Sequence, residues 1–139
     1  MKDAALLASP LFRGATSEEI AAMLPCLGAS PRRFARGERI LRAGEPTRYM
    51  GLVLTGSVLI EHTDMQGAVT LLGRAEPGDL FAEAYACLGG EPLEVAVLAA
   101  ADAEVLFLNS VQALSCARPG AAEFTRNLLT ILAGRNLTL

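Results

Sequence analysis

Histidine and tryptophan are almost missing from this chain of 139 residues, which has one histidine, His62, and no tryptophan. A catalytic metal centre on a β-barrel needs several histidines and a carboxylate that converge on one ion. One histidine cannot supply that ligand set, so the sequence argues against a metal-dependent enzyme of the cupin class. It predicts neither a metal site nor a cofactor, and we interpret His62 as a strand residue that faces solvent.

Cysteine is also scarce, because the chain has only Cys26, Cys87 and Cys116, which are widely separated. An iron–sulfur cluster needs about four closely grouped thiolates. A disulfide framework usually shows an even number of cysteines in a short chain. Since neither pattern is present, the sequence predicts buried, reduced thiols and a cytoplasmic location.

The chain lacks long apolar runs and an excess of basic residues. No apolar run approaches the roughly 18 residues of a membrane-spanning helix, and the first residues do not have the pattern of a signal peptide. The formal net charge of −3 gives no reason to expect nucleic-acid binding by this chain. Five arginines form a basic group that is more typical of a solvated face: Arg32, Arg33, Arg36, Arg39 and Arg42.

The sequence does have a hydrophobic fraction of 52% over a length that suits one globular domain. Apolar residues follow helical spacing in about residues 1–30, where Thr16 is the predicted N-cap of a helix and Gly28 its predicted end. Residues 32–109 contain short alternating strands with a turn about every eight to twelve residues, and residues 110–139 return to helical spacing. This order predicts a mainly-β jelly-roll barrel (a double-stranded β-helix) with flanking N- and C-terminal helices.

One segment of the predicted barrel has the features of an anion site. An alternating strand at residues 69–72 leads through the turn Pro77-Gly78 into a short apolar segment that carries one acid, Glu83. The pair Gly89-Gly90 then precedes another alternating strand at residues 93–97. A strand, turn, short helix, loop and strand in this order leaves backbone N–H groups free at the helix start, which suits an anion.

This segment resembles the phosphate-binding cassette of cyclic-nucleotide-binding domains, as found in the Crp/Fnr family of bacterial transcription regulators. Three other segments are similar to that family in the same order along the chain. Residues 9–19 resemble its N-terminal helices, residues 36–45 its first hairpin, and residues 49–58 its next strand–turn–strand. The order and spacing of these motifs extend over nearly the whole chain, which implies the N-terminal effector domain of such a regulator.

The resemblance assigns the ligand site to six positions: Ala82, Glu83, Ala84, Leu93, Glu94 and Val95. Glu83 matches the family's acid, which accepts hydrogen bonds from the ribose hydroxyl. Ala82 replaces the usual Gly, and Leu93 replaces the Arg whose charge-assisted hydrogen bonds hold the cyclic phosphate. Glu94 replaces a Ser or Thr, and an ionised acid in a partly buried pocket would repel a phosphate. The sequence therefore predicts weak or no binding of cyclic AMP and cyclic GMP.

The C-terminal helix has apolar residues on more than one side. One side can pack on the barrel, and a second side then remains to be buried. In the family, that second side packs against the same helix of a second subunit across a two-fold axis. The resemblance therefore implies a homodimer. The predicted interface residues are Phe124, Leu128, Ile131 and Leu132. A ligand would shift the cassette against this helix and reorient DNA-reading modules beyond it.

The resulting hypothesis is an effector-sensing and dimerisation domain of a Crp/Fnr-like regulator, without enzymatic activity, that binds a small-molecule effector. The family reads DNA through a helix-turn-helix after this domain. That segment is absent from the sequence, so we expect either part of a longer regulator or a stand-alone domain, with no membrane contact. The alternative is a ligand-binding module that regulates a protein partner, and a cupin-class enzyme, which would hold metal, is the third candidate.

Overall fold

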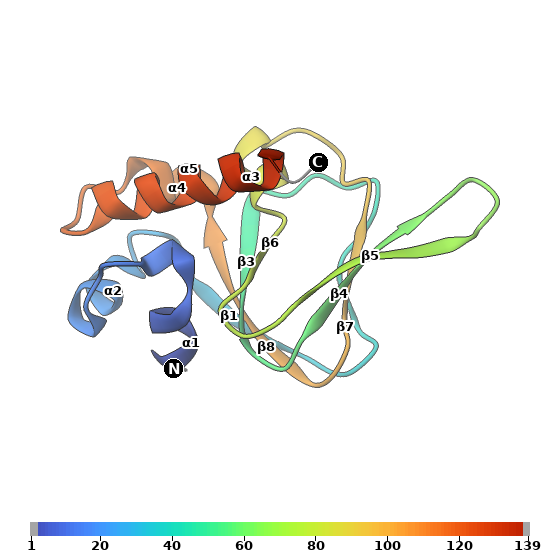
Figure 1. Ribbon diagram of the computed structural model, residues 1–139, viewed down its shortest axis with the longest axis horizontal. Helices are drawn as coiled ribbons and strands as arrows, with labels where there is room; N and C mark the ends of the chain where they lie inside the picture. The colour runs from blue at the N-terminus through green and yellow to red at the C-terminus, as the bar shows by residue number, and fades with distance from the viewer. Residues whose placement is uncertain (1–2, 138–139) are drawn as a thin grey trace.

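The computed structural model, which describes residues 3–137, consists of two antiparallel β-sheets with helices against one side (Figure 1). The first sheet has the strand order β1-β8-β3-β6 and the second β2-β7-β4-β5. The strands are β1 (Ser30–Phe34), β2 (Arg39–Leu41), β3 (Tyr49–Thr55), β4 (Val58–Thr63), β5 (Val69–Ala75), β6 (Leu80–Phe81), β7 (Ala96–Ala99) and β8 (Ala103–Asn109). The predicted mainly-β jelly roll with flanking helices is confirmed.

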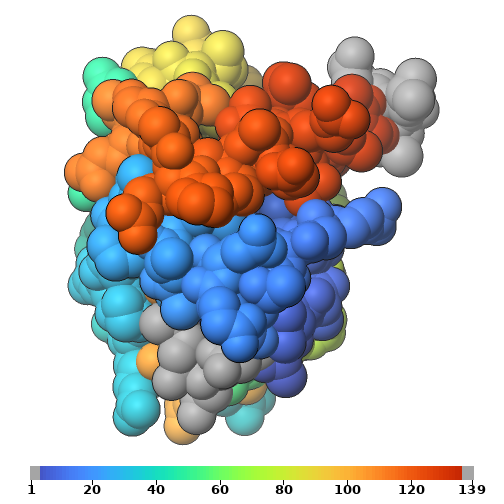
Figure 2. All heavy atoms as spheres, turned by 90° about the vertical axis from the view of Figure 1, so that its left-hand side faces the viewer, coloured from blue at the N-terminus to red at the C-terminus, as the bar shows by residue number. Residues whose placement is uncertain are grey.

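The helices are α1 (Asp3–Ala8), the 3-10 helix η1 (Pro10–Phe12), α2 (Ser17–Met23), α3 (Glu83–Leu88), α4 (Ser110–Ser115) and α5 (Ala121–Leu137). Figure 2 shows α5 lying across one face of the molecule, beside the N-terminal helical segment. The helix η1 packs directly against α5. The N-terminal helical segment and α5 therefore cover the same side of the barrel.

The start of α2 shows why this segment is helical. Thr16 Oγ1 accepts from the backbone N–H of Glu19 at 3.2 Å, and Glu19 Oε1 accepts from the N–H of Thr16 at 2.9 Å. This reciprocal capping box satisfies two of the N–H groups that a helix start leaves open, and it confirms Thr16 as the N-cap. The helix ends at Met23 and not at Gly28, because Pro25 lacks the N–H that would continue it.

Two apolar cores lie on either side of the first sheet. Alternate residues of a strand point to opposite faces, so Leu106 and Leu108 of β8 pack against the helices, while Val105 and Phe107 point into the barrel. The inner core also contains Phe81, whose ring centroid lies 6.4 Å from that of Phe107 in an edge-to-face arrangement. This inner core positions the segment that follows β6.

The prediction that all three cysteines are reduced thiols is wrong for two of them. Cys26, in the turn after α2, forms a disulfide with Cys116 at the end of α4, with Cα atoms 5.6 Å apart. The two cysteines are 90 positions apart in the sequence, and only the packing of the two helical segments brings them together. Cys87 is a free, half-buried thiol in α3.

Candidate functional site

The short helix α3 begins directly after β6 through an unusual backbone turn at Ala82. Ala82 has φ 62° and ψ 17°, and it is the one non-glycine residue with positive φ among residues 3–137. No side chain caps the helix start at this position. An L-residue in the left-handed region is disfavoured by roughly 1–2 kcal/mol, so the backbone keeps a conformation that suits glycine although the residue is alanine.

Glu83, the first residue of α3, is 3% exposed and forms an ion pair with Arg135 of α5. Arg135 also donates from Nη2 to the carbonyl oxygen of Leu80 at 3.2 Å. Leu80 is the first residue of β6 and lies two residues before Ala82. The same guanidinium therefore contacts both sides of the β6–α3 turn. The expected site acid is tied to the last turns of the C-terminal helix.

Leu93 is buried, with 3% of its surface exposed. Its backbone is held by two hydrogen bonds to the loop before β3, since Gly44 N donates to Leu93 O at 2.7 Å and Leu93 N donates to Glu45 O at 3.0 Å. A buried leucine supplies no charge and no hydrogen-bond donor from its side chain. The position that the resemblance assigns to phosphate binding is therefore apolar.

Glu94 differs from the expectation, because its side chain is exposed to solvent and not partly buried. Its backbone N–H donates to Tyr85 Oη at 3.3 Å, and its carbonyl oxygen lies 3.0 Å from His62 Nδ1. The backbone is thus fixed while the carboxylate points to water. Exposed charges are screened, so Glu94 opposes a phosphate less than the sequence suggests. His62 is exposed, as predicted.

The six predicted site residues do not form a single pocket. Ala84, Leu93 and Glu94 line a hollow of about 650 Å³ beside α3, and Glu91 adds a second acid to its wall. Ala82 packs against the inner core of the barrel, and Val95 is half-buried.

A different cavity, of about 430 Å³, lies between the β4–β5 hairpin, β6 and the end of α5. Its lining combines apolar and charged residues: Ile60, Leu72, Gly73, Arg74, Ala75, Asp79, Leu80 and Arg135. Two guanidinium groups thus border one cavity next to the cassette. Arg74 donates from Nη1 to Ser57 Oγ at 3.1 Å, which fixes its direction.

Sequence reasoning assigned no site role to Arg74 or Arg135, and no motif marks either residue. Cys87, on the same short helix as Glu83, was also not expected to be near the site. Burial raises the pKa of the Cys87 thiol, and the Glu83 carboxylate raises it further. The thiol therefore stays protonated near neutral pH.

The residues predicted to contact a second subunit lie mostly against the chain's own core. Phe124 and Leu128 are 1% and 2% exposed, and the Phe124 ring packs on Phe12 with centroids 5.7 Å apart. Ile131 and Leu132 are half-buried against the same core. The assignment of Phe124 and Leu128 to an intersubunit face is corrected, because the N-terminal helices cover that side of α5. Leu129, on the outer side, is 62% exposed.

Within residues 3–137, no helix combines the length and apolar character required to cross a membrane. The same part of the chain holds no cluster of three or more His, Cys, Asp or Glu side chains that could bind a metal ion.

Comparison with known proteins gives a family and a set of similar structures. The family described as cyclic nucleotide-binding domain matches residues 31–118. The catabolite activator protein of Thermus thermophilus is 27% identical with a TM-score of 0.80; the match covers 94% of this chain and 59% of that chain. This chain therefore spans less than two thirds of that protein. A search of curated proteins finds no match.

Two other solved structures show the same fold at lower identity. The sensor domain of the transcriptional regulator DNR from Pseudomonas aeruginosa is 19% identical, with a TM-score of 0.76 and coverage of 99% of this chain and 87% of that chain. The regulatory subunit of a cAMP-independent protein kinase A from Trypanosoma brucei is 20% identical, with a TM-score of 0.76 and coverage of 99% and 46%.

These matches confirm the resemblance to the cyclic-nucleotide-binding fold of Crp-type transcription regulators. The family match extends from β1 to the end of α4 and includes β6, α3 and the segment around Leu93. On this evidence, the chain belongs to the cyclic nucleotide-binding domain family.

Proposed function

We propose that this domain is the effector-sensing module of a Crp/Fnr-like transcription regulator, and that its effector is neither cyclic AMP nor cyclic GMP. One observation carries this proposal: Glu83, the cassette acid, is paired with Arg135 of α5. A sensor needs a contact between its ligand site and the element that transmits the signal. The ion pair is such a contact, because a ligand that competes for either partner changes what holds the end of α5.

The chemistry at the cassette supports an effector other than a cyclic nucleotide. The cyclic phosphate carries one negative charge, which is usually matched by a guanidinium with bidentate hydrogen bonds. Leu93 supplies neither. The nearby cationic groups, Arg74 and Arg135, instead border the cavity under the β4–β5 hairpin. We place the effector in that cavity, where it would meet Arg135 directly and act on the domain without catalysis.

Dimerisation is part of the same proposal. Since the inner side of α5 is buried within the subunit, the outer side is the one that would meet a second copy. Leu129 is the large apolar side chain there, with Ala122, Arg126 and Ala133 exposed at helical spacing around it. The small side chains of Ala122 and Ala133 on that face allow two helices to approach closely.

Native mass spectrometry of protein purified from cells tests both parts in one experiment. We expect the mass of two chains plus a small organic molecule that is lost when the protein is denatured. Leu129→Glu is expected to give the mass of one chain, while Arg118→Glu, an exposed charge change before α5, keeps the dimer. A bound cyclic nucleotide, or a wild-type monomer without ligand across the micromolar range, would contradict the proposal and favour a module that acts on a protein partner.

A further inference from the structure

A second cleft lies on the other open edge of the barrel, away from Glu83 and α5. The strands β1 and β2 are both edge strands, because β1 pairs only with β8 and β2 only with β7. The strands β5 and β6 form the opposite edges, next to Arg135. Between β1 and β2 the two sheets leave a cleft of about 320 Å³, lined by Ser30, Arg32, Ile40, Leu41, Thr47, Tyr49 and Phe107.

The floor of this cleft is apolar and aromatic. Phe107 is 7% exposed and belongs to the inner core, and Tyr49 meets it edge to face with ring centroids 6.4 Å apart. Ile40 and Leu41 are half-buried on the facing strand. The cleft is thus an opening onto the barrel core, with a size at the lower end of the usual range for small-molecule sites, about 300–1,000 Å³.

The polar groups of the cleft are few, and one is already satisfied. Thr47 Oγ1 accepts from Tyr49 N and donates to Tyr49 O, both at 3.0 Å. Arg32 remains as the cation. Its guanidinium lies over the Phe34 ring at 5.4 Å from the centroid. Among the side chains described, those of residues 4–135, no acid forms an ion pair with it. Arg32 is therefore a cation at the rim of an apolar cleft, where it contacts an aromatic ring.

The segment that contains β1 and β2 carries an excess of positive charge, the same sign as Arg32. Six of the twelve basic residues of the chain lie between residues 32 and 48, where there are two acids, although the whole chain carries a net charge of −3. Arg32 lines the cleft, and Arg33 and Arg39 lie on the two strands that border it, although Arg33 pairs with Glu104 on the other face of β1. Such a local field attracts anions and raises their rate of encounter with the cleft.

We propose that this cleft is a second small-molecule site, which takes a monocarboxylate with an aromatic or aliphatic body. The carboxylate pairs with Arg32, for which bidentate hydrogen bonds are the preferred geometry. The apolar body covers the exposed edge of Phe107 between Tyr49 and Leu41. This site is separate from the cavity at Arg135 and does not depend on the effector proposed for that cavity.

Hydrocinnamate is a suitable probe, because it joins a phenyl ring to one carboxylate, and hydrocinnamide is its neutral control. We expect titration with hydrocinnamate into the millimolar range to shift the NMR amide resonances of Arg32, Leu41 and Tyr49. The amide resonances of Gly73 and Glu83 should not shift during the same titration. Hydrocinnamide should bind about tenfold more weakly, since its neutral amide lacks the charge that pairs with the Arg32 guanidinium.

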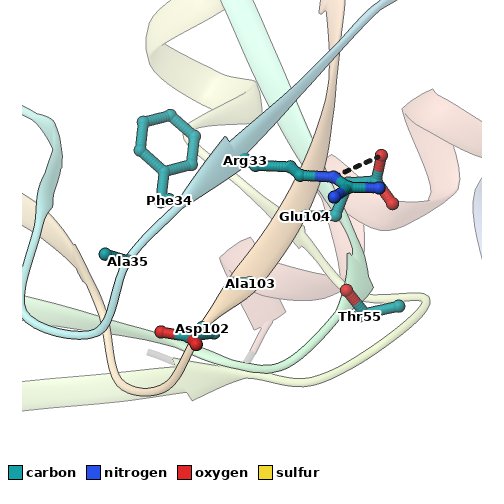
Figure 3. Close-up of a pocket in the computed structure, with 7 residues that line it drawn as sticks. All are labelled: Arg33, Phe34, Ala35, Thr55, Asp102, Ala103 and Glu104. Atoms are coloured by element: carbon teal, nitrogen blue, oxygen red, sulfur yellow. Dashed lines mark ion pairs between the residues drawn. The ribbon is translucent and has the colours of Figure 1, made fainter.

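The adjacent arginine supplies a matched control. Arg32→Gln is expected to weaken hydrocinnamate binding about tenfold, while Arg33→Gln removes the same charge one residue along β1 and leaves the affinity within about twofold. Figure 3 shows Arg33 turned away from Phe34 and toward Glu104, with which it forms an ion pair at 4.0 Å. Consecutive strand residues point to opposite faces, so the two variants separate contact with the ligand from general charge.

Three results would overturn the proposal. The first is the absence of any saturable shift with hydrocinnamate. The second is equal affinity for hydrocinnamate and hydrocinnamide, or equal weakening by Arg32→Gln and Arg33→Gln, because general charge or hydrophobicity would then explain the binding. The third is a set of shifts centred on Gly73 and Glu83, which would assign the carboxylate to the Arg135 cavity instead.

Discussion

Arg135 of α5 forms an ion pair with the buried Glu83 at the first position of α3, and so joins the C-terminal helix to the cassette. The Glu83 side chain is 4% exposed and that of Arg135 is 56% exposed. The carboxylate thus depends on one partly solvated guanidinium for its charge partner. This pair is the direct link between the candidate ligand site and the helix proposed to transmit the signal.

Removing the guanidinium should destabilise the domain. We expect Arg135→Ala to lower the free energy of unfolding by about 2 kcal/mol, because it leaves a buried carboxylate without its charged hydrogen-bond donor. Arg118→Ala, an exposed change just before the same helix, should lower it by less than about 0.5 kcal/mol. Urea denaturation measures both. Glu83→Gln combined with Arg135→Ala should destabilise by less than the sum of the single changes, and strict additivity would show that the pair is not coupled.

We expect Ala82→Gly to change the stability of the domain in the opposite direction from most alanine-to-glycine substitutions in helices. Ala82→Gly should stabilise the domain by up to about 1 kcal/mol, because glycine adopts a φ of 62° without a Cβ clash. Ala84→Gly, at an exposed helical position in α3, should destabilise by about 1 kcal/mol. Thermal unfolding followed by circular dichroism distinguishes the two signs. Destabilisation by both variants would mean that Ala82 is not strained.

The disulfide between Cys26 and Cys116 should contribute substantially to stability. In the chain-entropy model a loop of about 90 residues corresponds to about 4–5 kcal/mol. We expect reduction, or Cys26→Ser with Cys116→Ser, to lower the free energy of unfolding by several kcal/mol, while Cys87→Ser has a much smaller effect. Thiol titration of the unreduced, denatured protein should find one free thiol, Cys87. Three free thiols would contradict the disulfide.

The reactivity of the Cys87 thiol should depend on pH. Burial and then Glu83 raise the pKa of its thiol, so the thiolate forms only at higher pH than in an unfolded chain, where the pKa is about 8.5. The alkylation rate should therefore rise at higher pH than for a free cysteine. Because the native state holds its proton longer, this group's contribution to stability is full below the unfolded pKa and is lost as pH rises through the folded pKa. Alkylation at the rate of an unfolded control would contradict this.

The fold was predictable from the sequence because its signals are local. Alternating apolar residues, turns with Gly or Pro, and the Thr16 and Glu19 capping box each depend on neighbours in the chain. The sequence placed the C-terminal end of α2 at Gly28, a few residues too late, because the apolar spacing continues past Pro25. The helix itself ends at Met23, since Pro25 has no N–H to continue the helical hydrogen bonds.

The site was predictable only in part, because its contacts join distant segments. The replacement of the usual arginine by Leu93 is visible in the sequence, but the partner of Glu83 is not, since nothing in the helical pattern of residues 121–137 marks Arg135. The pairing of Cys26 with Cys116 and the burial of Phe124 against Phe12 also depend on how the two helical segments pack. Side-chain periodicity shows that α5 is apolar on several sides, but not which side meets the core.

The central claim is that this cyclic nucleotide-binding domain responds to a different effector, and isothermal titration calorimetry with cyclic AMP and cyclic GMP tests it most directly. We predict no saturable heat with either nucleotide up to high micromolar concentrations, because Leu93 supplies no charge for the cyclic phosphate. The double change Leu93→Arg and Glu94→Ser should improve binding if the pocket is otherwise preserved. A low-micromolar dissociation constant for the wild-type domain with either nucleotide would contradict the claim.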